Sequence, residues 1–395
     1  MLNVDDIKLI IRENSVLNDI NSDIFGEVFT PEFLIQNMVD IIPDHIYKDP
    51  DTKILDNSVG KGNYTIFLIE KLLRWHSYEH IISNMLYFCD IQESSYLFMK
   101  EIFGDKINYH LGSFIESDFD SMMKTWNVNL FTLTIGNPPY NARKENKTNG
   151  NIIYDEFVIK SFDISDNICF VHPGLWRKPL DKNSNIKDIF SLFKESNLKY
   201  LNINSAKEGK KIFNRLTNFD WYYLEKNTIY NKTIINDIDG NEVEIDISDY
   251  KFLPNKNFEL VKSHTGNNDL EVIFNSKYHA VRDYVSKDRS DIYKYPLIHS
   301  TPKNEIKYRY SSINNKGHFN IPKIIIGETS YVNYVIDELG EYGMTQGAMG
   351  IVFKNNEQKQ RIINFLNSDV FSKILDSCMW SSYRIDANLI KLINF

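Results

Sequence analysis

The chain has 395 residues, a mass of 46.4 kDa and a formal net charge of −8, and it is long enough for roughly two or three domains with a sizeable core. Hydrophobic residues make up 42% and charged residues 25%, as in ordinary globular proteins, and 17 Gly and 11 Pro are too few for collagen-like or low-complexity classes. We expect no membrane span and no signal peptide, because no long apolar run is present and the first residues lack the basic and apolar regions of a leader.

Two helices are predicted at the start of the chain, over 1–20 and 31–42, from apolar residues at helical spacing. Thr30 suits the N-cap of the second helix, and Pro31 suits its first helical position, where a missing N–H costs nothing. From residue 53 onward, short buried strands alternate with helices. Strands are expected at 53–56, 85–90, 107–111, 130–135, 168–171 and 200–204, and helices at about 64–75, 92–103, 152–162 and 185–195.

These repeated units of strand and helix predict a parallel, doubly wound α/β sheet covered by helices on both faces. Ligands of such sheets bind at the carboxyl ends of the strands. Residues 221–226 and the region around Asp239-Gly240 are expected to form antiparallel strands and a hairpin.

The regular alternation then ends and turn signals multiply, so we place a domain boundary at 250–258. The predicted domains are 1–250, with a helical lead-in over 1–50, and a mixed α+β domain over 251–395. The second domain has 19 Lys and Arg against 15 Asp and Glu, and 277–323 alone has 10 against 4, interleaved with aromatic residues. This pattern suits a phosphate backbone and unstacked bases, although a solvated surface has the same composition.

A glycine turn, 56–62, follows the first predicted strand and reads Asp-Asn-Ser-Val-Gly-Lys-Gly. Its glycines allow unusual backbone dihedrals and let a ligand approach the main chain, and Asp56 can accept from a cationic amine. A third glycine of the dinucleotide fingerprint is missing, and a purely structural turn explains the segment as well. Asp90 ends the next strand, where an acid either binds ribose hydroxyls or caps the following helix.

The sharpest motif is Asn137-Pro138-Pro139-Tyr140, at the end of the fourth strand. Two consecutive prolines fix the backbone and remove two donors, and the residue before each proline is held extended. The turn therefore presents an amide oxygen and a bare carbonyl, both acceptors suited to an NH2 group, together with an aromatic ring that can stack on a base.

The order Phe29-Thr30-Pro31, Asp56 to Gly62, Asp90 and Asn137 to Tyr140 resembles S-adenosylmethionine-dependent N6-adenine DNA methyltransferases of the gamma subgroup, which occur in bacterial and phage restriction–modification systems. The resemblance covers about residues 25–226. It implies a class I methyltransferase sheet followed by a DNA-recognition domain. Two positions depart from the family pattern: Asn57 replaces a usual proline, and Ser113 stands where an acid usually contacts the cofactor adenine.

The resemblance implies a role for each matching residue. Asn137 and the Pro138 carbonyl would hold the amine of the target adenine, Pro139 would complete the catalytic loop, and Tyr140 and Phe213 would stack on the two faces of the flipped base. The implied contacts to S-adenosylmethionine are Thr30, Pro31, Asp56, Gly60, Gly62, Asp90, Ile91, Ser113, Phe114 and Asn137. The expected DNA-binding residues are Lys207, Lys210, Lys211 and Arg215, which flank Phe213, and Arg282, Lys303, Lys307 and Arg309 in the basic region.

The expected partner is double-stranded DNA, and no metal and no membrane are expected to take part. We expect a monomer in the cytoplasm, encoded by a bacterium or a phage; three scattered cysteines, Cys89, Cys169 and Cys378, fit that reducing compartment. Whether a separate cognate restriction endonuclease acts with the chain stays open.

Other interpretations stay open too. The same Asn-Pro-Pro-Tyr clamp serves N-methyltransferases that act on RNA or on a protein glutamine. A fused restriction enzyme is disfavoured because fewer than 30 residues precede the Phe-Thr-Pro element, and binding without transfer is disfavoured because the tetrapeptide is intact. Residues 221–223 are alternatives to Phe213 for the second stacking face, although packing in the core explains them better.

Overall fold

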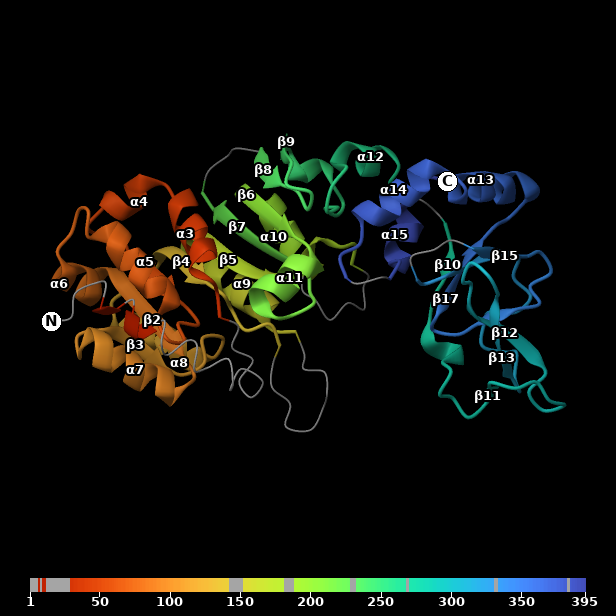
Figure 1. The fold of residues 1–395 in the computed structure, drawn as a ribbon, viewed down its shortest axis with the longest axis horizontal. Helices are drawn as coiled ribbons and strands as arrows, with labels where there is room; N and C mark the ends of the chain where they lie inside the picture. The colour runs from red at the N-terminus through yellow and green to blue at the C-terminus, as the bar shows by residue number, and fades with distance from the viewer. Residues whose placement is uncertain are drawn as a thin grey trace. The chain divides into compact units, whose positions relative to one another are not determined.

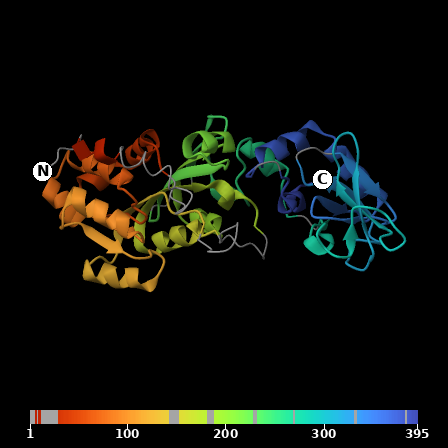
Figure 2. The same ribbon diagram turned by 60° about the horizontal axis from the view of Figure 1, so that its bottom comes forward.

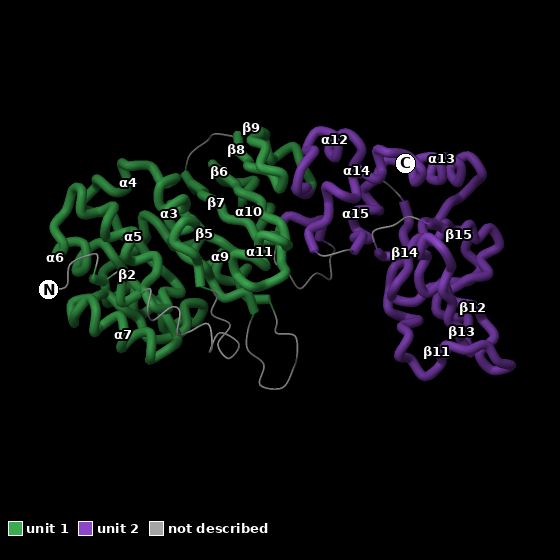
Figure 3. The backbone as a smooth tube through the Cα atoms, viewed as in Figure 1, with its two compact units in different colours: residues 1–176, 182–251 green, residues 177–181, 252–395 purple. Residues whose placement is uncertain are grey.

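The computed structural model describes residues 6–7, 9–11, 29–141, 152–180, 188–227, 232–267, 270–329, 333–381 and 384–395. The chain divides into two compact units, shown in Figure 3. Unit 1 comprises Met1–Trp176 with Lys182–Lys251, and unit 2 comprises Arg177–Asp181 with Phe252–Phe395. Unit 2 is therefore built from two segments of the chain. The first of these is short and interrupts the sequence of unit 1.

Unit 1 is built on a nine-stranded sheet with the order β3-β2-β1-β4-β5-β7-β6-β8-β9 (Figure 1). The strands are β1 (Ile54–Asp56), β2 (Leu86–Asp90), β3 (Asn108–Leu111), β4 (Phe131–Gly136), β5 (Ser165–Pro173), β6 (Asn197–Asn204), β7 (Phe219–Glu225), β8 (Thr233–Asn236) and β9 (Glu242–Ile245). Strands β1 to β5 pair in parallel, and β7 lies antiparallel between β5 and β6. The predicted doubly wound sheet is confirmed, with β8 and the hairpin strand β9 added at its edge.

Helices cover both faces of this sheet (Figures 1 and 2). They are α3 (Glu32–Ile41), α4 (Asp44–Lys48), α5 (Asn63–Leu72), α6 (Tyr78–His80), α7 (Glu93–Phe103), α8 (Ser117–Thr125), α9 (Tyr154–Ile164), α10 (Ile189–Lys194) and α11 (Ala206–Phe213). Consecutive residues of a strand point to opposite faces of the sheet, and in β1 and β2 the residues on both faces are apolar. Ile54 and Phe88 pack in a cluster with α3, α5 and α7, whereas Leu55 and Cys89 pack with α8 and α9.

The start of α3 differs from the prediction by one residue. Pro31, not Thr30, is the N-cap, its backbone is extended at φ −64° and ψ 148°, and no side chain caps the helix. The N-cap assignment of Thr30 was wrong because its hydroxyl accepts a hydrogen bond from the Asn137 side chain instead. The helix predicted over 1–20 lies largely outside the described residues; of these, 6–7 and 9–11 are helical.

The topology places a ligand-binding edge between β1 and β4. From β1 the chain adds β2 and β3 on one side and then returns to add β4 on the other, so β1 and β4 flank the switch point. Asp56, the last residue of β1, pairs with Ile135 in β4. The loops that leave these two strands therefore begin side by side.

Unit 2 contains two four-stranded sheets, β10-β17-β14-β15 and β11-β13-β12-β16. The strands are β10 (Val272–Ile273), β11 (Val285–Ser286), β12 (Tyr295–Ser300), β13 (Lys307–Ser311), β14 (Lys323–Gly327), β15 (Tyr334–Asp337), β16 (Gly343–Met344) and β17 (Ala348–Val352), and the helices are α12 (Phe258–Ser263), α13 (Asn356–Leu366), α14 (Asp369–Ser377) and α15 (Ala387–Leu392). The pairing is antiparallel except between β12 and β16. Unit 2 is thus a mixed α+β unit, as predicted.

Candidate functional site

The loop that follows β4 lies against the glycine turn that follows β1. The Ser58 hydroxyl donates to the main-chain carbonyl of Asn137 at 3.2 Å. Gly136 touches the same turn: a Cβ at this position would lie 3.1 Å from Asp56 Oδ1. A side chain at position 136 would push the two loops apart, so the glycine allows the close approach that brings the two motifs together.

The side chain of Asn137 is tied to the segment that precedes α3. Its Nδ2 donates to Thr30 Oγ1 at 3.1 Å, and Thr30 is only 2% exposed. The three motifs separated in the sequence, the Phe-Thr-Pro element, the glycine turn and the 137–140 loop, therefore meet at one edge of the sheet. This edge is the one formed by the carboxyl ends of β1 and β4.

The glycine turn depends on its two glycines. Gly60 and Gly62 have φ of +51° and +79°, in the left-handed region that other residues rarely adopt. A Cβ on Gly62 would also lie 2.7 Å from Met99 Sδ of α7. Gly62 precedes α5 directly, so the turn bends the chain from β1 into that helix.

Asp90 joins the glycine turn to the end of β2. One carboxylate oxygen accepts from Gly60 N at 2.9 Å, and the other accepts from Gln92 N at 2.9 Å. Gln92, not Asp90, is the N-cap of α7, so capping does not account for the acid. The neighbouring Ile91 is 70% exposed and leaves an apolar surface open beside it.

Asp56 is buried in an unusual state for a carboxyl group. It is 1% exposed, Oδ1 accepts from Ser58 N at 3.2 Å, and Oδ2 has no hydrogen-bond partner among the described residues. Burial raises the pKa of Asp56 to about 8, and the negative charge of Asp90 adds to the rise. A cation brought to this carboxyl group would supply the missing partner and favour its ionised form.

The remaining residues of the 137–140 loop present a rigid, partly exposed surface. Pro138 is buried, Pro139 and the ring of Tyr140 are partly exposed, and the Tyr140 carbonyl accepts from Ile153 N at 3.2 Å. Burial raises the pKa of the Tyr140 hydroxyl, and the adjacent Asn137 side chain opposes this rise. Tyr140 therefore stays neutral at ordinary pH and offers a flat ring face.

The two departures from the family pattern have different surroundings. Asn57 is 1% exposed, and its Nδ2 donates to Ser161 Oγ of α9 at 3.1 Å, so it ties the turn to a helix where a proline could donate nothing. Ser113 is partly exposed, and its carbonyl accepts from Glu116 N. Phe114, next to it, is 1% exposed and packs on Phe119 at a ring-centroid distance of 4.9 Å.

Phe213 is the last residue of α11, 7% exposed, and its ring meets Phe219 edge-on at 4.8 Å within the core of unit 1. The basic residues around it, Lys207, Lys210, Lys211 and Arg215, are all exposed. Lys210 also donates to Asn214 Oδ1 at 2.7 Å near the end of the helix. The structure thus places charges on the surface of α11 and the aromatic ring on its buried side.

The predicted DNA-binding residues of unit 2 lie on or near one sheet. Arg282, Lys303 and Lys307 are exposed, and Arg309 is partly exposed. Lys307 and Arg309 are two residues apart in β13, so their side chains lie on the same face of the sheet. Burial, together with both of these charges, lowers the pKa of His299 on the adjacent strand β12.

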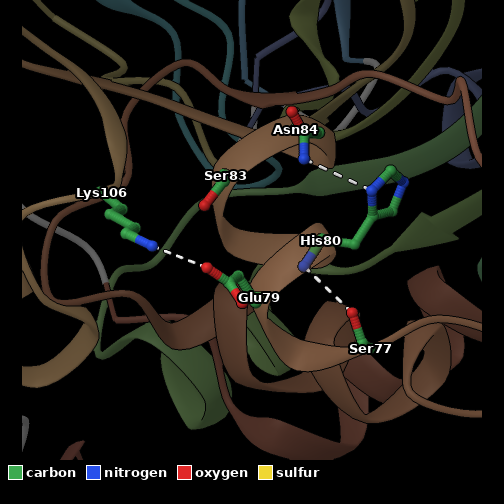
Figure 4. A pocket seen from close by; sticks show the side chains of 6 residues that line it. All are labelled: Ser77, Glu79, His80, Ser83, Asn84 and Lys106. Carbon is green, nitrogen blue, oxygen red and sulfur yellow. Dashed lines mark hydrogen bonds and ion pairs between the residues drawn. The ribbon is translucent and has the colours of Figure 1, made fainter.

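An open depression of about 660 Å³ is found elsewhere in unit 1, lined by Ser77, Glu79, His80, Ser83, Asn84 and Lys106 (Figure 4). These residues precede β2 and β3, so the depression lies at the amino ends of the strands and not at the edge that carries the motifs. Its groups bond to one another, with Lys106 Nζ 2.6 Å from Glu79 Oε1 and Asn84 Nδ2 3.3 Å from His80 Nδ1. We assign no function to it.

Sequence reasoning missed one residue that contacts the site. The Ser58 hydroxyl donates to the Asn137 carbonyl. Ser58 could have been found, because it lies inside the glycine turn.

Across the described part of the chain, no group of three or more His, Cys, Asp or Glu residues is arranged to hold a metal ion. No helix in that part of the chain is both long and apolar enough to cross a bilayer.

No model of a known protein family matches the sequence, and no curated protein does. Solved structures do match. The type ISP restriction–modification enzyme LlaGI, solved as a nuclease-deletion mutant with a DNA substrate mimic, aligns with 94% of this chain and 46% of its own at 15% identity and a TM-score of 0.58. The ATP-dependent type ISP enzyme LlaBIII, solved bound to DNA, aligns with 98% of this chain and 40% of its own at 13% identity and a TM-score of 0.55.

A third structure, the methyltransferase subunit of a type I restriction–modification system from Streptococcus thermophilus, aligns with 53% of this chain and 47% of its own at 14% identity and a TM-score of 0.40. The chain thus spans less than half the length of each of these three proteins. The likeness is one of fold. The α/β unit has the class I methyltransferase fold, and the two type ISP alignments extend over both units.

Proposed function

We propose that the chain is an S-adenosylmethionine-dependent DNA methyltransferase that modifies N6 of an adenine flipped out of double-stranded DNA. The observation that carries this proposal is the convergence of Thr30, the glycine turn and Asn137 at the switch-point edge of the sheet. An amide oxygen and a main-chain carbonyl held there can accept from the two hydrogens of one amino group.

The residues at the edge fit the cofactor. The unpartnered oxygen of Asp56 suits the cationic amine, and the left-handed backbone of Gly60 and Gly62, of which Gly60 is partly exposed, suits the carboxylate. Asp90 would hold the ribose hydroxyls. Thr30 and Pro31 would border the methionine end, while Ile91, Ser113 and Phe114 would surround the adenine. S-adenosylmethionine supplies a sulfonium methyl group, and no metal is required for its transfer.

Asn137 and Pro138 would activate the acceptor nitrogen. The amine of adenine is a weak nucleophile because its lone pair is delocalised into the ring. Two acceptors on its hydrogens favour the geometry in which the lone pair points out of the ring and stabilise positive charge that develops on nitrogen. The rigid backbone of the two prolines holds these acceptors in place, so alignment supplies part of the rate.

The target base must leave the duplex to reach this edge, which costs a few kcal/mol. Tyr140 would stack on one face of the base. Phe213 would cover the other face, for which its 7% exposed ring would have to turn out of the core, and each stacking contact contributes roughly 1–3 kcal/mol. Exposed cations on α11 and β13 would neutralise phosphates.

DNA is favoured over other substrates by two observations. Residues 277–323 have an excess of basic residues interleaved with tyrosines, and the whole-chain structural matches are to enzymes solved with DNA or a DNA substrate mimic. The test is transfer of a tritiated methyl group from S-adenosylmethionine to double-stranded DNA, RNA and a release-factor-type protein in parallel. We expect label in DNA, as N6-methyladenine, and label only in RNA or protein would contradict the proposal.

A further inference from the structure

The segment between β6 and β7 carries an exposed leucine, Leu216, at the same edge of the sheet as the 137–140 loop. The pairing of the strands fixes this position. β5 runs parallel to β4, and its last residue, Pro173, pairs with Phe219, the first residue of the antiparallel strand β7. Residues 205–218 therefore leave the carboxyl end of β6 and return to β7 at the edge of the sheet that holds the proposed site (Figure 1).

The register also sets how far this segment reaches. Neighbouring strands are about 4.8 Å apart, so β7 begins roughly 10 Å from β4, on the far side of β5. Gly136 pairs with Phe170, and β5 continues for three more residues to Pro173. At about 3.3 Å per residue, the segment before β7 starts roughly 10 Å farther out along the strand direction than the 137–140 loop does. A group on this segment can thus reach a substrate that lies over that loop.

The backbone around Leu216 is held by hydrogen bonds. Asn214 ends α11 in the left-handed region at φ +54°, and Arg215 N donates to the Gly209 carbonyl at 3.3 Å. Thr217 N donates to the Arg215 carbonyl at 2.9 Å, which closes a three-residue turn with Leu216 at its tip. A Cβ on Gly209 would collide with the Thr217 carbonyl oxygen, so the turn can pack on the helix only because this residue is glycine.

The side chain of Leu216 nevertheless stays in solvent. Leu216 is 61% exposed, and the cations near it in the sequence, Lys207, Lys211 and Arg215, are exposed as well. A single exposed leucine is ordinary on a protein surface. This one combines a fixed backbone, flanking cations and a place at the edge where the substrate base is proposed to bind. Cations attract the phosphates of a duplex, and an aliphatic side chain among them suits insertion between base pairs.

We propose that Leu216 enters the duplex at the target adenine and fills the space that the flipped base leaves. This inference rests on the proposed function and adds to it the group that keeps the duplex open. Extrusion of a base loses stacking and pairing, and an apolar side chain in the gap restores part of the lost contact and hinders the return of the base. The role is distinct from stacking on the flipped base itself, which the proposed function gives to Tyr140 and Phe213.

The test compares two duplexes that carry the site at which the wild type forms N6-methyladenine, located by sequencing methylated DNA. In one duplex the target adenine is paired with thymine, and in the other it faces an abasic position, so that no pairing has to be broken. Leu216→Ala should lower the single-turnover methylation rate of the paired duplex by about tenfold, the effect of losing one leucine contact. On the abasic duplex its rate should stay within about twofold of the wild type, because the base leaves the stack more easily.

Leu130→Ala is the matched control. Leu130 is also an exposed leucine of unit 1, at 41%, but it directly precedes β4 and lies at the amino end of that strand, away from the proposed site. Its substitution should leave the rates on both duplexes unchanged. Leu216→Met keeps an apolar side chain of similar volume and should retain most of the wild-type rate on the paired duplex.

A fluorescent base follows the extrusion directly. When 2-aminopurine replaces the target adenine, its fluorescence rises as it leaves the stack, and this rise should be smaller with Leu216→Ala than with the wild type. Equal losses of rate on the two duplexes would show that Leu216 covers the flipped base or supports the fold, and would overturn the inference, as would an unchanged rate on the paired duplex. A wild type that forms no N6-methyladenine in DNA would instead overturn the proposed function.

Discussion

At the scale of single residues, the site contains side chains whose ionisation differs from that of the same groups in water. Asp56 is the clearest case, because it is buried beside Asp90 with one oxygen unpartnered, and its pKa is raised to about 8. Such a carboxyl group is mostly protonated at neutral pH. A cationic amine can bind to it favourably only when the acid has lost its proton, so binding and ionisation are linked.

The linkage predicts how cofactor affinity depends on pH. Below about pH 8 binding must expel one proton, so the affinity for S-adenosylhomocysteine should fall by up to about tenfold for each pH unit of acidification. At still higher pH the ligand amine itself loses its proton, so the rise in affinity should stop there. Titration calorimetry at pH 6, 7 and 8 would measure this trend. In Asp56→Asn the affinity for S-adenosylhomocysteine should be weaker than in the wild type and should change little with pH over the acidic range. If the affinity of this variant fell as steeply with acidification as that of the wild type, a group other than Asp56 would be the one that titrates.

His172 is a second buried group with a displaced pKa. It is 0% exposed, its ring stacks on Tyr154 with centroids 4.6 Å apart, and burial lowers its pKa to about 4. Because the unfolded state binds the proton more readily, the stability that neutral His172 retains above pH 6.5 is lost as the pH falls from 6.5 toward 4. His172→Gln should flatten this part of the stability profile, measured by urea denaturation at a series of pH values. A profile of unchanged slope would assign the acid sensitivity to other groups.

At the scale of secondary-structure elements, the parallel strands could be predicted because each is a short apolar, β-branched run followed by a turn signal. The bounds were less accurate: the strand expected at 168–171 is Ser165–Pro173, because pairing with β4 and β7 extends it beyond its apolar centre. The contribution of residues 177–181 to unit 2 had no local signal. Long-range pairing decides these features, and local patterns do not contain it.

The candidate site, too, could be predicted only in part from the sequence. The motif order was sufficient to bring Asp56, Asp90 and Asn137 to one edge, because the carboxyl ends of parallel strands meet there. The contacts that orient the side chains could not be predicted, since they join residues that are distant in the sequence. Thr30 is one example: it has the local pattern of a helix cap, and its actual partner is Asn137.

One element of unit 2 contains a buried ion pair. Lys323 in β14 lies opposite Asp337 in β15, with Nζ 2.6 Å from Oδ2 and both side chains at most 1% exposed. Asp337 also accepts from the main-chain N–H groups of Glu341 and Tyr342, so the pair fixes the turn after β15. Removing one partner would leave a buried charge without compensation.

Lys323→Met is therefore expected to lower the free energy of unfolding by about 3–5 kcal/mol. The double variant Lys323→Met with Asp337→Asn should recover part of that reduction, because the asparagine is neutral and its one side-chain oxygen still accepts from one N–H group of the turn. Arg384→Met is the control in the same unit, since Arg384 is 70% exposed in its ion pair with Glu328 and should cost at most about 1 kcal/mol. Urea denaturation measures all three, and a double variant no better than the single one would contradict the account.

At the scale of the whole molecule, opposite charges are divided between the two parts of the chain. Residues 251–395 have a net positive charge within a protein of net charge −8. Such a division concentrates attraction for a polyanion in unit 2 while the chain as a whole stays acidic. If chemistry and DNA binding are separate tasks, we expect unit 1 to carry out the first and the basic α+β unit the second.

DNA binding should then depend steeply on salt. Each Lys or Arg that pairs with a phosphate adds about 0.9 to the magnitude of the slope of log K against log salt, so Lys307→Ala should lower that magnitude by roughly one. Lys354→Ala removes the same charge from an exposed position outside the basic segment and should leave the slope nearly unchanged. Fluorescence anisotropy with labelled duplex DNA at several salt concentrations would measure both. Equal changes in the two variants would indicate that net charge alone, and no specific phosphate pairing of Lys307, sets the salt dependence.

The central claim, that Asn137 activates an amine beside a bound methyl donor, is tested most directly by Asn137→Ala. The measurement is the amount of N6-methyladenine formed in duplex DNA, with the affinity for S-adenosylhomocysteine determined in the same preparation. The account predicts that methylation is abolished while cofactor binding survives within a few-fold. Methylation of DNA adenine at a rate close to that of the wild type would contradict it.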